Sequence, residues 1–190
     1  PEADRARFVA SIAAQGDRMA LMVDKLLALA AVEHRQCIEQ PQKLDVAELL
    51  HAATAAVRQR ADAAGIALVI DAQEAVTVSG DPFMLQQALV NLIDNALDFA
   101  LRGSSIEVHA SGNGQDTCIE VRDRGSGVPE FARERVFERF YSLPRPDGGS
   151  RSSGLGLPFV AQVAALHGGH AELVEREDGG SVARISLPVG

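Results

Sequence analysis

The N-terminal segment, residues 1–36, constrains the fold more than any other part of this sequence. After its first residue it contains no proline, and its large apolar side chains recur at steps of three, four and seven residues. This spacing predicts one long amphipathic helix with a nearly heptad stripe, ended by Pro41. The stripe consists of Phe8, Ile12, Met19, Met22, Leu26 and Leu29.

A single helix of this kind cannot bury its own apolar stripe. Its partner must therefore be a second helix, another chain or the domain that follows. Two interpretations stay open, an ordinary core helix and a helix of an intermolecular bundle. The near-heptad spacing favours the bundle, because helices of a bundle pack along a seam with that period.

Composition excludes several classes of protein. A chain of 190 residues allows one full domain with an extra piece. The net charge of −8 argues against a nucleic-acid partner, and the hydrophobic fraction of 46% argues against general disorder. Cys37 and Cys118 are too few and too far apart for a disulfide scaffold or a cysteine zinc site. Because the chain begins at Pro1 rather than Met, we expect it to be a piece excised from a longer protein.

From residue 41 onward, helical and strand patterns mix without regular β-α-β alternation. This favours an α+β two-layer sandwich over a doubly wound sheet. Asp45 and the pair Asp81-Pro82 are helix-start signals, and Gly65 and Gly103 are stop signals. We expect helices over 46–64, 81–101, 130–136 and 155–166, and strands over 66–71, 76–78, 105–110, 117–122, 171–175 and 182–187, with a glycine- and proline-rich loop over 142–153.

The expected helix 81–101 carries an unusual polar face. Asn91, Asn95 and Asp98 are separated by steps of four and three, which places them in line. Asparagine is a mediocre helix former, so two of them on one mid-helix face need a reason. They belong either to a solvated polar face or to a row of amide oxygens that offers hard ligands to Mg²⁺.

Two glycine motifs follow later in the chain. Asp123, Gly125 and Gly127 form a D-x-G-x-G motif directly after a strand, where an ionised aspartate accepts hydrogen bonds and the glycines let backbone approach a flat ring. The run 153–157, which contains Gly154, Leu155, Gly156 and Leu157, feeds a helix N-terminus and therefore forms a candidate anion site. Each motif alone also fits an ordinary turn.

Aromatic residues are concentrated just before the flexible loop. Only 4% of the chain is aromatic, yet Phe137, Phe140 and Tyr141 lie within five positions. They pack either as a plain hydrophobic anchor or as the hinge of a moving lid.

Taken in order, these motifs resemble the ATP-binding catalytic domain of sensor histidine kinases, in the wider superfamily of gyrase, Hsp90, histidine kinases and MutL. The resemblance covers residues 42–188, and the tracts 95–99 and 138–146 look most like the CreC-type sensor kinases. It implies a Bergerat-type ATP-binding fold, a mixed sheet of about five strands with three helices, preceded by a long helix from a dimerisation bundle.

The resemblance also implies roles for individual residues. Asn95 would coordinate Mg²⁺, Asn91 would contact the metal-phosphate group, and Asp98 would lie near the phosphates. Asp123 would accept the adenine amine. The other implied nucleotide-binding residues are Gly125, Gly127 and Ser181 around the base, and Tyr141, Arg145, Arg151, Gly154, Leu155, Gly156 and Leu157 in and beside a lid over 141–153.

By the same resemblance, residues 1–40 would be the second helix of the dimerisation and phosphoacceptor hairpin, and residues 41–190 the catalytic domain. None of the five histidines is followed by the acceptor-box pattern, so the acceptor would lie outside this chain. The implied partners are ATP or ADP, a second copy of the parent protein and a response regulator receiver domain. The parent would be an inner-membrane protein with this part in the cytoplasm, reaching the membrane only through its missing N-terminal part.

Two competing functions remain. ATPases of the same superfamily carry a glutamate at the position of Asn91 as the base for water, and an amide has no basic lone pair for that work. Asn91 therefore favours phosphoryl transfer over hydrolysis. A nucleotide-gated binding module without kinase activity is the other alternative, because most of the family has a basic residue at the position of Asp98.

Overall fold

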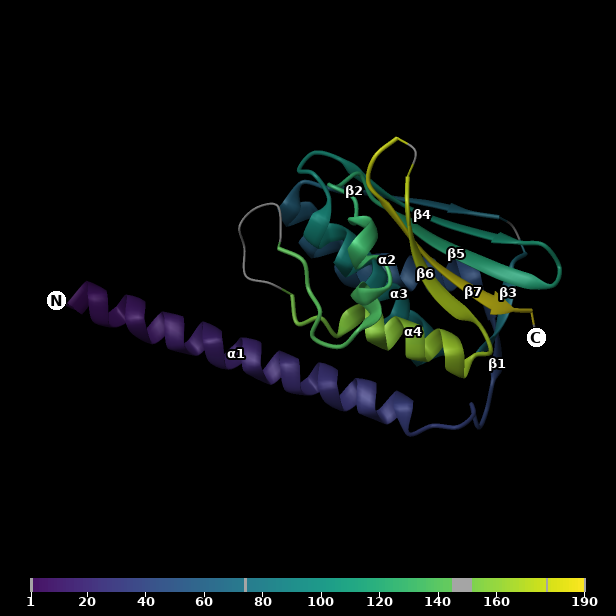
Figure 1. Ribbon diagram of the computed structural model, residues 1–190, viewed down its shortest axis with the longest axis horizontal. Coiled ribbons are helices and arrows are strands. Elements are labelled where there is room, and N and C mark those ends of the chain that lie inside the picture. The colour runs from purple at the N-terminus through teal and green to yellow at the C-terminus, as the bar shows by residue number, and fades with distance from the viewer. Residues whose placement is uncertain (1, 74, 145–151, 177, 190) are drawn as a thin grey trace.

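The computed structural model of the protein describes residues 2–73, 75–144, 152–176 and 178–189. Its body is an α+β sandwich with a long N-terminal helix that projects beyond it (Figure 1). The expected fold class is therefore confirmed. No helix in these ranges is long and apolar enough to cross a membrane.

One layer is a mixed five-stranded sheet. Its order is β2-β4-β5-β7-β6; β2 and β4 are parallel, and every other neighbouring pair is antiparallel. A separate antiparallel pair joins β1 to β3. The strands of the large sheet are β2 (Ala67–Ala72), β4 (Ser105–Gly112), β5 (Asp116–Arg122), β6 (His170–Glu175) and β7 (Ser181–Pro188), and those of the small sheet are β1 (Gln42–Asp45) and β3 (Thr77–Gly80).

The second layer consists of α2 (Val46–Ala64), α3 (Pro82–Phe99) and α4 (Gly156–Leu166), which cover one face of the large sheet. Local sequence sets the ends of α2. The Asp45 side chain accepts a hydrogen bond from the Ala47 amide at 2.8 Å, and Gly65 ends the helix in the left-handed conformation with φ +67°. The expected bounds of α2 are confirmed.

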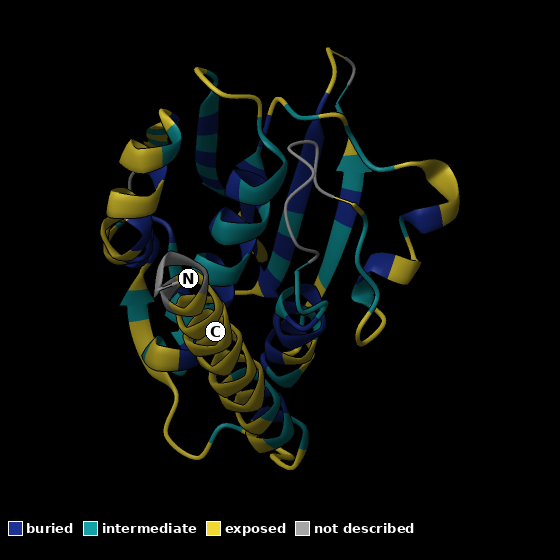
Figure 2. Ribbon diagram, turned by 90° about the vertical axis from the view of Figure 1, so that its left-hand side faces the viewer, coloured by how far each residue is buried: buried dark blue, intermediate teal, exposed yellow. Residues whose placement is uncertain are grey.

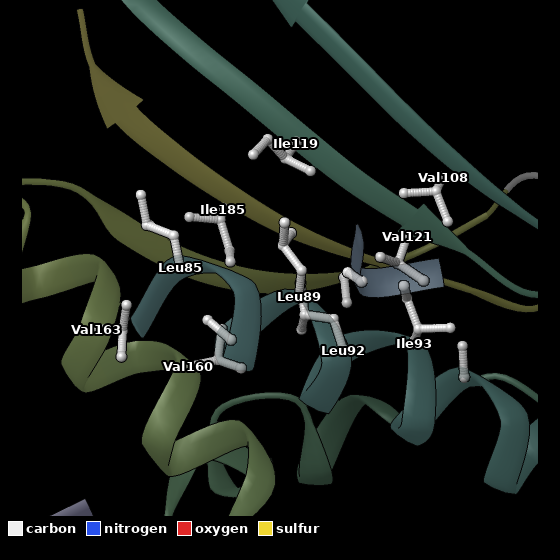
Figure 3. Packing of buried hydrophobic residues seen from close by; sticks show 14 of the residues in the cluster. Leu85, Leu89, Leu92, Ile93, Val108, Ile119, Val121, Val160, Val163 and Ile185 are labelled. Atoms are coloured by element: carbon white, nitrogen blue, oxygen red, sulfur yellow. The ribbon is translucent and has the colours of Figure 1, made fainter. Parts of the chain in front are cut away.

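The core lies between α3, α4 and the sheet. Figure 3 shows apolar side chains of both helices pointing toward those of β4, β5 and β7. On α3 the buried residues recur at three- and four-residue steps, so one face of the helix is committed to the sheet and the other is left to carry polar groups. The labelled side chains are Leu85, Leu89, Leu92 and Ile93 of α3, Val160 and Val163 of α4, and Val108, Ile119, Val121 and Ile185 of the sheet.

A buried imidazole holds the start of α3 against the end of α4. The Nδ1 atom of His167 lies 2.7 Å from the Val163 carbonyl oxygen, and Nε2 accepts a hydrogen bond from the Asp81 amide at 3.1 Å. Burial lowers the pKa of His167, which favours the neutral ring that this pair of bonds requires. Asp81 in turn caps α3 by accepting from the Met84 amide at 3.0 Å.

Three details differ from the expectations. Helix α3 ends at Phe99 instead of at about Leu101, because Ala100 turns to an extended conformation and bridges to Gly125. The expected helix over 130–136 is two short 3₁₀ turns, η1 (Glu130–Ala132) and η2 (Arg135–Phe137). Strand β1 was not expected, since its four residues show no clear alternation.

The helix α1 (Glu2–Glu33) divides its apolar stripe between two environments. Near its end, Leu29 and Val32 are buried in the core, and Glu33 pairs with Arg139. Earlier in the helix Phe8 and Ile12 are exposed, and Figure 2 shows α1 exposed over most of its length. The core-helix interpretation thus applies only to the last turns of α1.

Candidate functional site

A cleft of about 590 Å³ opens between the helices, the segment that follows β5, and residues of β6 and β7. Its size is within the usual range for small-molecule sites, roughly 300–1,000 Å³. The cleft brings together most of the residues singled out in the sequence. Those lining it are Asn91, Asn95, Asp98, Asp123, Gly127, Tyr141, Gly154, Gly156, Leu157 and Ser181.

The remaining sequence candidates are placed differently. Gly125 lies beside the cleft, between Asp123 and Gly127, without lining it. Leu155 is buried in the core, with an exposed fraction of 1%, so it supports the start of α4 from behind. Arg145 and Arg151 lie outside the described residues.

Asp123 forms the buried end of the cleft. Its carboxylate accepts a hydrogen bond from the Gly125 amide at 2.7 Å, and its own amide donates to the Ser181 carbonyl oxygen at 3.0 Å. Burial raises the pKa of Asp123, while the backbone groups of Gly125 and Ser181 and the charge of Arg176 act in the opposite direction. The result is an acceptor fixed by backbone in a nearly water-free position.

Close backbone packing explains the glycine at position 125. A Cβ atom there would lie 2.4 Å from the Phe99 carbonyl oxygen, at the point where α3 ends and Ala100 bridges to Gly125. Any side chain would push the loop after β5 away from α3. Gly125 therefore fixes the distance between Asp123 and the polar face of α3.

That polar face contains one more residue than the sequence pattern suggested. Asp94 lies with Asn91, Asn95 and Asp98 along the cleft, so the four residues form one stripe at steps of three and four. Burial raises the pKa of Asp94, and the charge of Asp98 acts in the same direction. The stripe thus combines two amide oxygens with two carboxylates.

Arg60 of α2 contacts both carboxylates. Its guanidinium pairs with Asp94 and lies 3.4 Å from the Asp98 Oδ1 atom. Together with Lys25 of α1, it opposes the effect of burial on the pKa of Asp94. Sequence reasoning missed Arg60 and Lys25, since nothing in their local sequence marks them. Asp94 had a signal, because it occupies the same helical stripe as the asparagines.

The start of α4 closes the third side of the cleft. Its first residue, Gly156, is so near α3 that a Cβ atom there would lie 3.4 Å from the Asn91 Oδ1 atom. The N-cap residue Leu155 supplies no side-chain hydrogen bond to the first turn. Amides at a helix start attract negative groups, so this side of the cleft suits an anion.

The two ends of the glycine-rich loop are tied together. The Phe140 amide donates to the Gly154 carbonyl oxygen at 2.9 Å, and the hydroxyls of Ser142 and Ser152 are 2.9 Å apart. Phe140 and Gly154 both have positive φ, +63° and +64°, and a Cβ atom on Gly154 would lie 2.6 Å from the Phe140 carbonyl carbon. Only glycine fits at position 154 without moving Phe140.

Chemically, the cleft offers a fixed acceptor at one end and hard oxygen ligands with a helix start at the other. Amide and carboxylate oxygens suit Mg²⁺, which also keeps waters and borrows phosphate oxygens. Within the described ranges, no cluster of three or more histidine, cysteine, aspartate or glutamate side chains forms a metal site. The asparagine oxygens of α3 fit a metal that takes its other ligands from water and phosphate.

Comparison with known proteins adds the family. Residues 80–190 match the family described as "Histidine kinase-, DNA gyrase B-, and HSP90-like ATPase". The chain is 40% identical over 182 residues to Sensor protein CreC of Escherichia coli (strain K12), an alignment that covers 96% of this chain and 38% of CreC. The chain thus spans about two fifths of that relative's length.

Two solved structures have a similar fold. The chain superposes on full-length ShkA in complex with AMPPNP with a TM-score of 0.80 and 26% identity, covering 97% of this chain and 39% of ShkA. It superposes on the mycobacterial sensor histidine kinase MprB with a TM-score of 0.68 and 28% identity, covering 78% of this chain and 97% of the MprB chain.

Proposed function

The chain belongs to the histidine kinase-, DNA gyrase B- and HSP90-like ATPase family, and on that basis we propose that it is the catalytic ATP-binding part of a two-component sensor histidine kinase. It binds Mg-ATP and donates the γ-phosphoryl group to a histidine outside this chain. One observation carries the proposal: the buried acceptor Asp123 and the asparagines of α3 line the same cleft.

Asp123 is the adenine-binding residue in this proposal. An ionised carboxylate accepts the exocyclic amine of adenine, and the backbone of Gly125 and Ser181 holds it in place. Gly127, with φ +70°, keeps the loop wall free of a side chain where the base would lie. A base that offered an acceptor instead of an amine would place two acceptors face to face and would donate no hydrogen bond to this buried carboxylate.

Asn95 is the proposed Mg²⁺ ligand, and Asn91 contacts the metal-phosphate group from one turn earlier. When bound, Mg²⁺ neutralises part of the phosphate charge. Asn91 lies against Gly156, so the same residue also faces the start of α4, where amides favour phosphate. Tyr141, Gly154 and Leu157 complete this side of the cleft.

Phosphoryl transfer to an outside histidine is favoured over hydrolysis. Asn91 stands where a hydrolase of this family would need a base, and an amide cannot accept a proton from water. Among the described residues that line the cleft there is no histidine. The five histidines of the chain are His34, His51, His109, His167 and His170.

Helix α1 indicates how the chain divides into domains. We propose that residues 1–40 belong to a dimerisation hairpin and residues 41–190 form the catalytic domain. The exposed stripe of α1, from Phe8 to Met22, supports a homodimer of the parent protein, because isolated apolar stripes are covered by partner helices. The parent then passes the phosphoryl group to a response regulator receiver domain and sits in the inner membrane, with this part in the cytoplasm.

A nucleotide-gated binding module without kinase activity is the second candidate. Asp94 and Asp98 favour it, because two carboxylates near the phosphates oppose the build-up of negative charge during transfer. Incubating the full-length parent with labelled ATP separates the two functions. Acid-labile phosphate on the parent supports the kinase, and nucleotide binding without labelling supports the module.

The chain itself tests nucleotide binding. Saturating ADP with Mg²⁺, at a hundred times its Kd, is expected to add about 2.7 kcal/mol to the free energy of unfolding. A thermal midpoint that ADP leaves unchanged would contradict the proposal.

The chain is also expected to self-associate through α1, which sedimentation measures. It should remain unphosphorylated when incubated with ATP, so phosphate on any of its histidines would place the acceptor inside this chain.

A further inference from the structure

Arg60 is the one residue of α2 that lines the cleft. It is half exposed, with a side-chain exposed fraction of 52%, whereas its partners Asp94 and Asp98 are at 27% and 15%. One terminal nitrogen of its guanidinium pairs with Asp94 and the other approaches Asp98. A side chain from a neighbouring helix therefore bridges both carboxylates of the α3 stripe.

The two carboxylates pose an electrostatic problem for the proposed ligand. They lie in the same stripe as Asn91 and Asn95, which are the proposed contacts of the metal and the phosphates. A carboxylate and a phosphate repel each other strongly at short range when little water separates them. A polyphosphate can bind beside Asp94 and Asp98 only if a cation offsets their charge.

We propose that Arg60 is a phosphate-recognition residue of this cleft, supplied by α2 and held in place by Asp94 and Asp98. The inference rests on the proposed nucleotide function and adds a specificity-determining residue to it. Arg60 both cancels the repulsion from the carboxylates and contacts the phosphate chain. It thereby makes the cleft prefer nucleotides with more phosphate groups.

The geometry of arginine suits both tasks. A guanidinium has five N–H donors in a rigid plane, so two carboxylates can be bound while other donors stay available for a phosphate oxygen. The two carboxylates come from successive turns of α3, which fixes the plane of the guanidinium along that helix. Arg60 is half exposed and lines the cleft, so a phosphate bound there can reach it.

Lys25 of α1 adds a second positive charge beside the carboxylates of α3. It lines the cleft and acts with Arg60 on the charge of Asp94. Arg18, about two helical turns before Lys25 on α1, lines the cleft as well. Arg60 differs from both in that it belongs to the sandwich itself and bridges two acidic residues of α3.

The test is a calorimetric titration of this chain with adenosine, Mg-ADP and Mg-ATP. Arg60→Gln is expected to lower the affinity for ATP about tenfold and the affinity for ADP by a smaller factor. The affinity for adenosine should stay unchanged. Arg58→Gln is the matched control, because Arg58 is exposed on the same helix and does not line the cleft. It should leave all three affinities unchanged.

Two results would overturn the inference. An equal loss for adenosine, ADP and ATP would give Arg60 a merely structural role, and equal affinities of wild type and Arg60→Gln would give it none. Should Arg60→Gln fold poorly, the double variant Arg60→Gln/Asp98→Asn lowers the negative charge beside position 60 and must still bind ATP more weakly than Asp98→Asn alone. A wild-type chain that binds no nucleotide would contradict the proposed function instead.

Discussion

The two ends of the cleft each contain a carboxyl group whose pKa is raised by burial, but different groups oppose that effect. At Asp123 they are mainly backbone groups of Gly125 and Ser181. At Asp94 they are the side chains of Arg60 and Lys25. Backbone groups are held in place by the fold and cannot move independently of it. Long side chains, in contrast, can rearrange when a ligand binds.

This difference matches what each end is proposed to bind. A flat base presents a fixed pattern of donors and acceptors, so a rigid acceptor recognises it best. A phosphate chain with its metal is flexible and highly charged, and side-chain cations can follow it. We therefore expect a substitution at Asp123 to abolish nucleotide binding. Substitutions of the charged residues between α2 and α3 should change nucleotide affinity only by degrees.

The largest effect is expected from Asp123→Ala. The adenine amine would lose its buried acceptor, so the stabilisation by saturating Mg-ADP, about 2.7 kcal/mol in wild type, should disappear. Thermal melts with and without nucleotide measure it. Asp116→Ala is the control, because Asp116 is exposed at the opposite end of β5. Wild-type binding by Asp123→Ala would remove the distinction between the two ends.

A smaller, graded effect is expected from Asp98→Lys. Replacing a carboxylate near the phosphates by a cation should tighten ATP by about tenfold at most, or about 1.4 kcal/mol, and leave the metal dependence alone. Titrating ATP into both proteins at several Mg²⁺ concentrations checks it. A loss of affinity that occurs only with Mg²⁺ would instead make Asp98 part of the metal's water shell.

The smallest effect concerns pH and the protein without nucleotide. Because the folded pKa of Asp123 is raised above 3.8, the folded state holds its proton more tightly, and this group makes stability fall as pH rises from about 4 through the raised pKa. Asp123→Asn removes that loss. It should raise the thermal midpoint at neutral pH and raise it by less at pH 4.5.

Asp94→Asn sharpens the same comparison at the other end. It also removes a carboxyl with a raised pKa, but it takes a charged partner from Arg60, so its gain at neutral pH should be smaller than that of Asp123→Asn. Scanning calorimetry of both variants at pH 4.5 and 7.5 decides it. Equal gains would mean that backbone and side-chain partners stabilise these carboxylates alike.

Local sequence determined much of this protein by itself. The Asp45 cap and the left-handed Gly65 set both ends of α2, and the spacing of apolar residues set the buried face of α3. The same helical periodicity placed Asn91, Asn95 and Asp98 together, since residues three and four apart share a face. These features depend on neighbours in the chain, so the sequence alone sufficed to predict them.

Tertiary structure decided the rest, because those features depend on residues far apart in sequence. Arg60 meets Asp94 and Asp98 only where α2 packs beside α3, and the end of α3 at Phe99 depends on the bridge from Ala100 to Gly125. In α1 one continuous apolar stripe predicts one environment, yet Leu29 is buried and Phe8 exposed. The physical reason is that only the last turns of α1 lie against α4. The periodicity of a sequence carries no information about where a neighbouring surface ends.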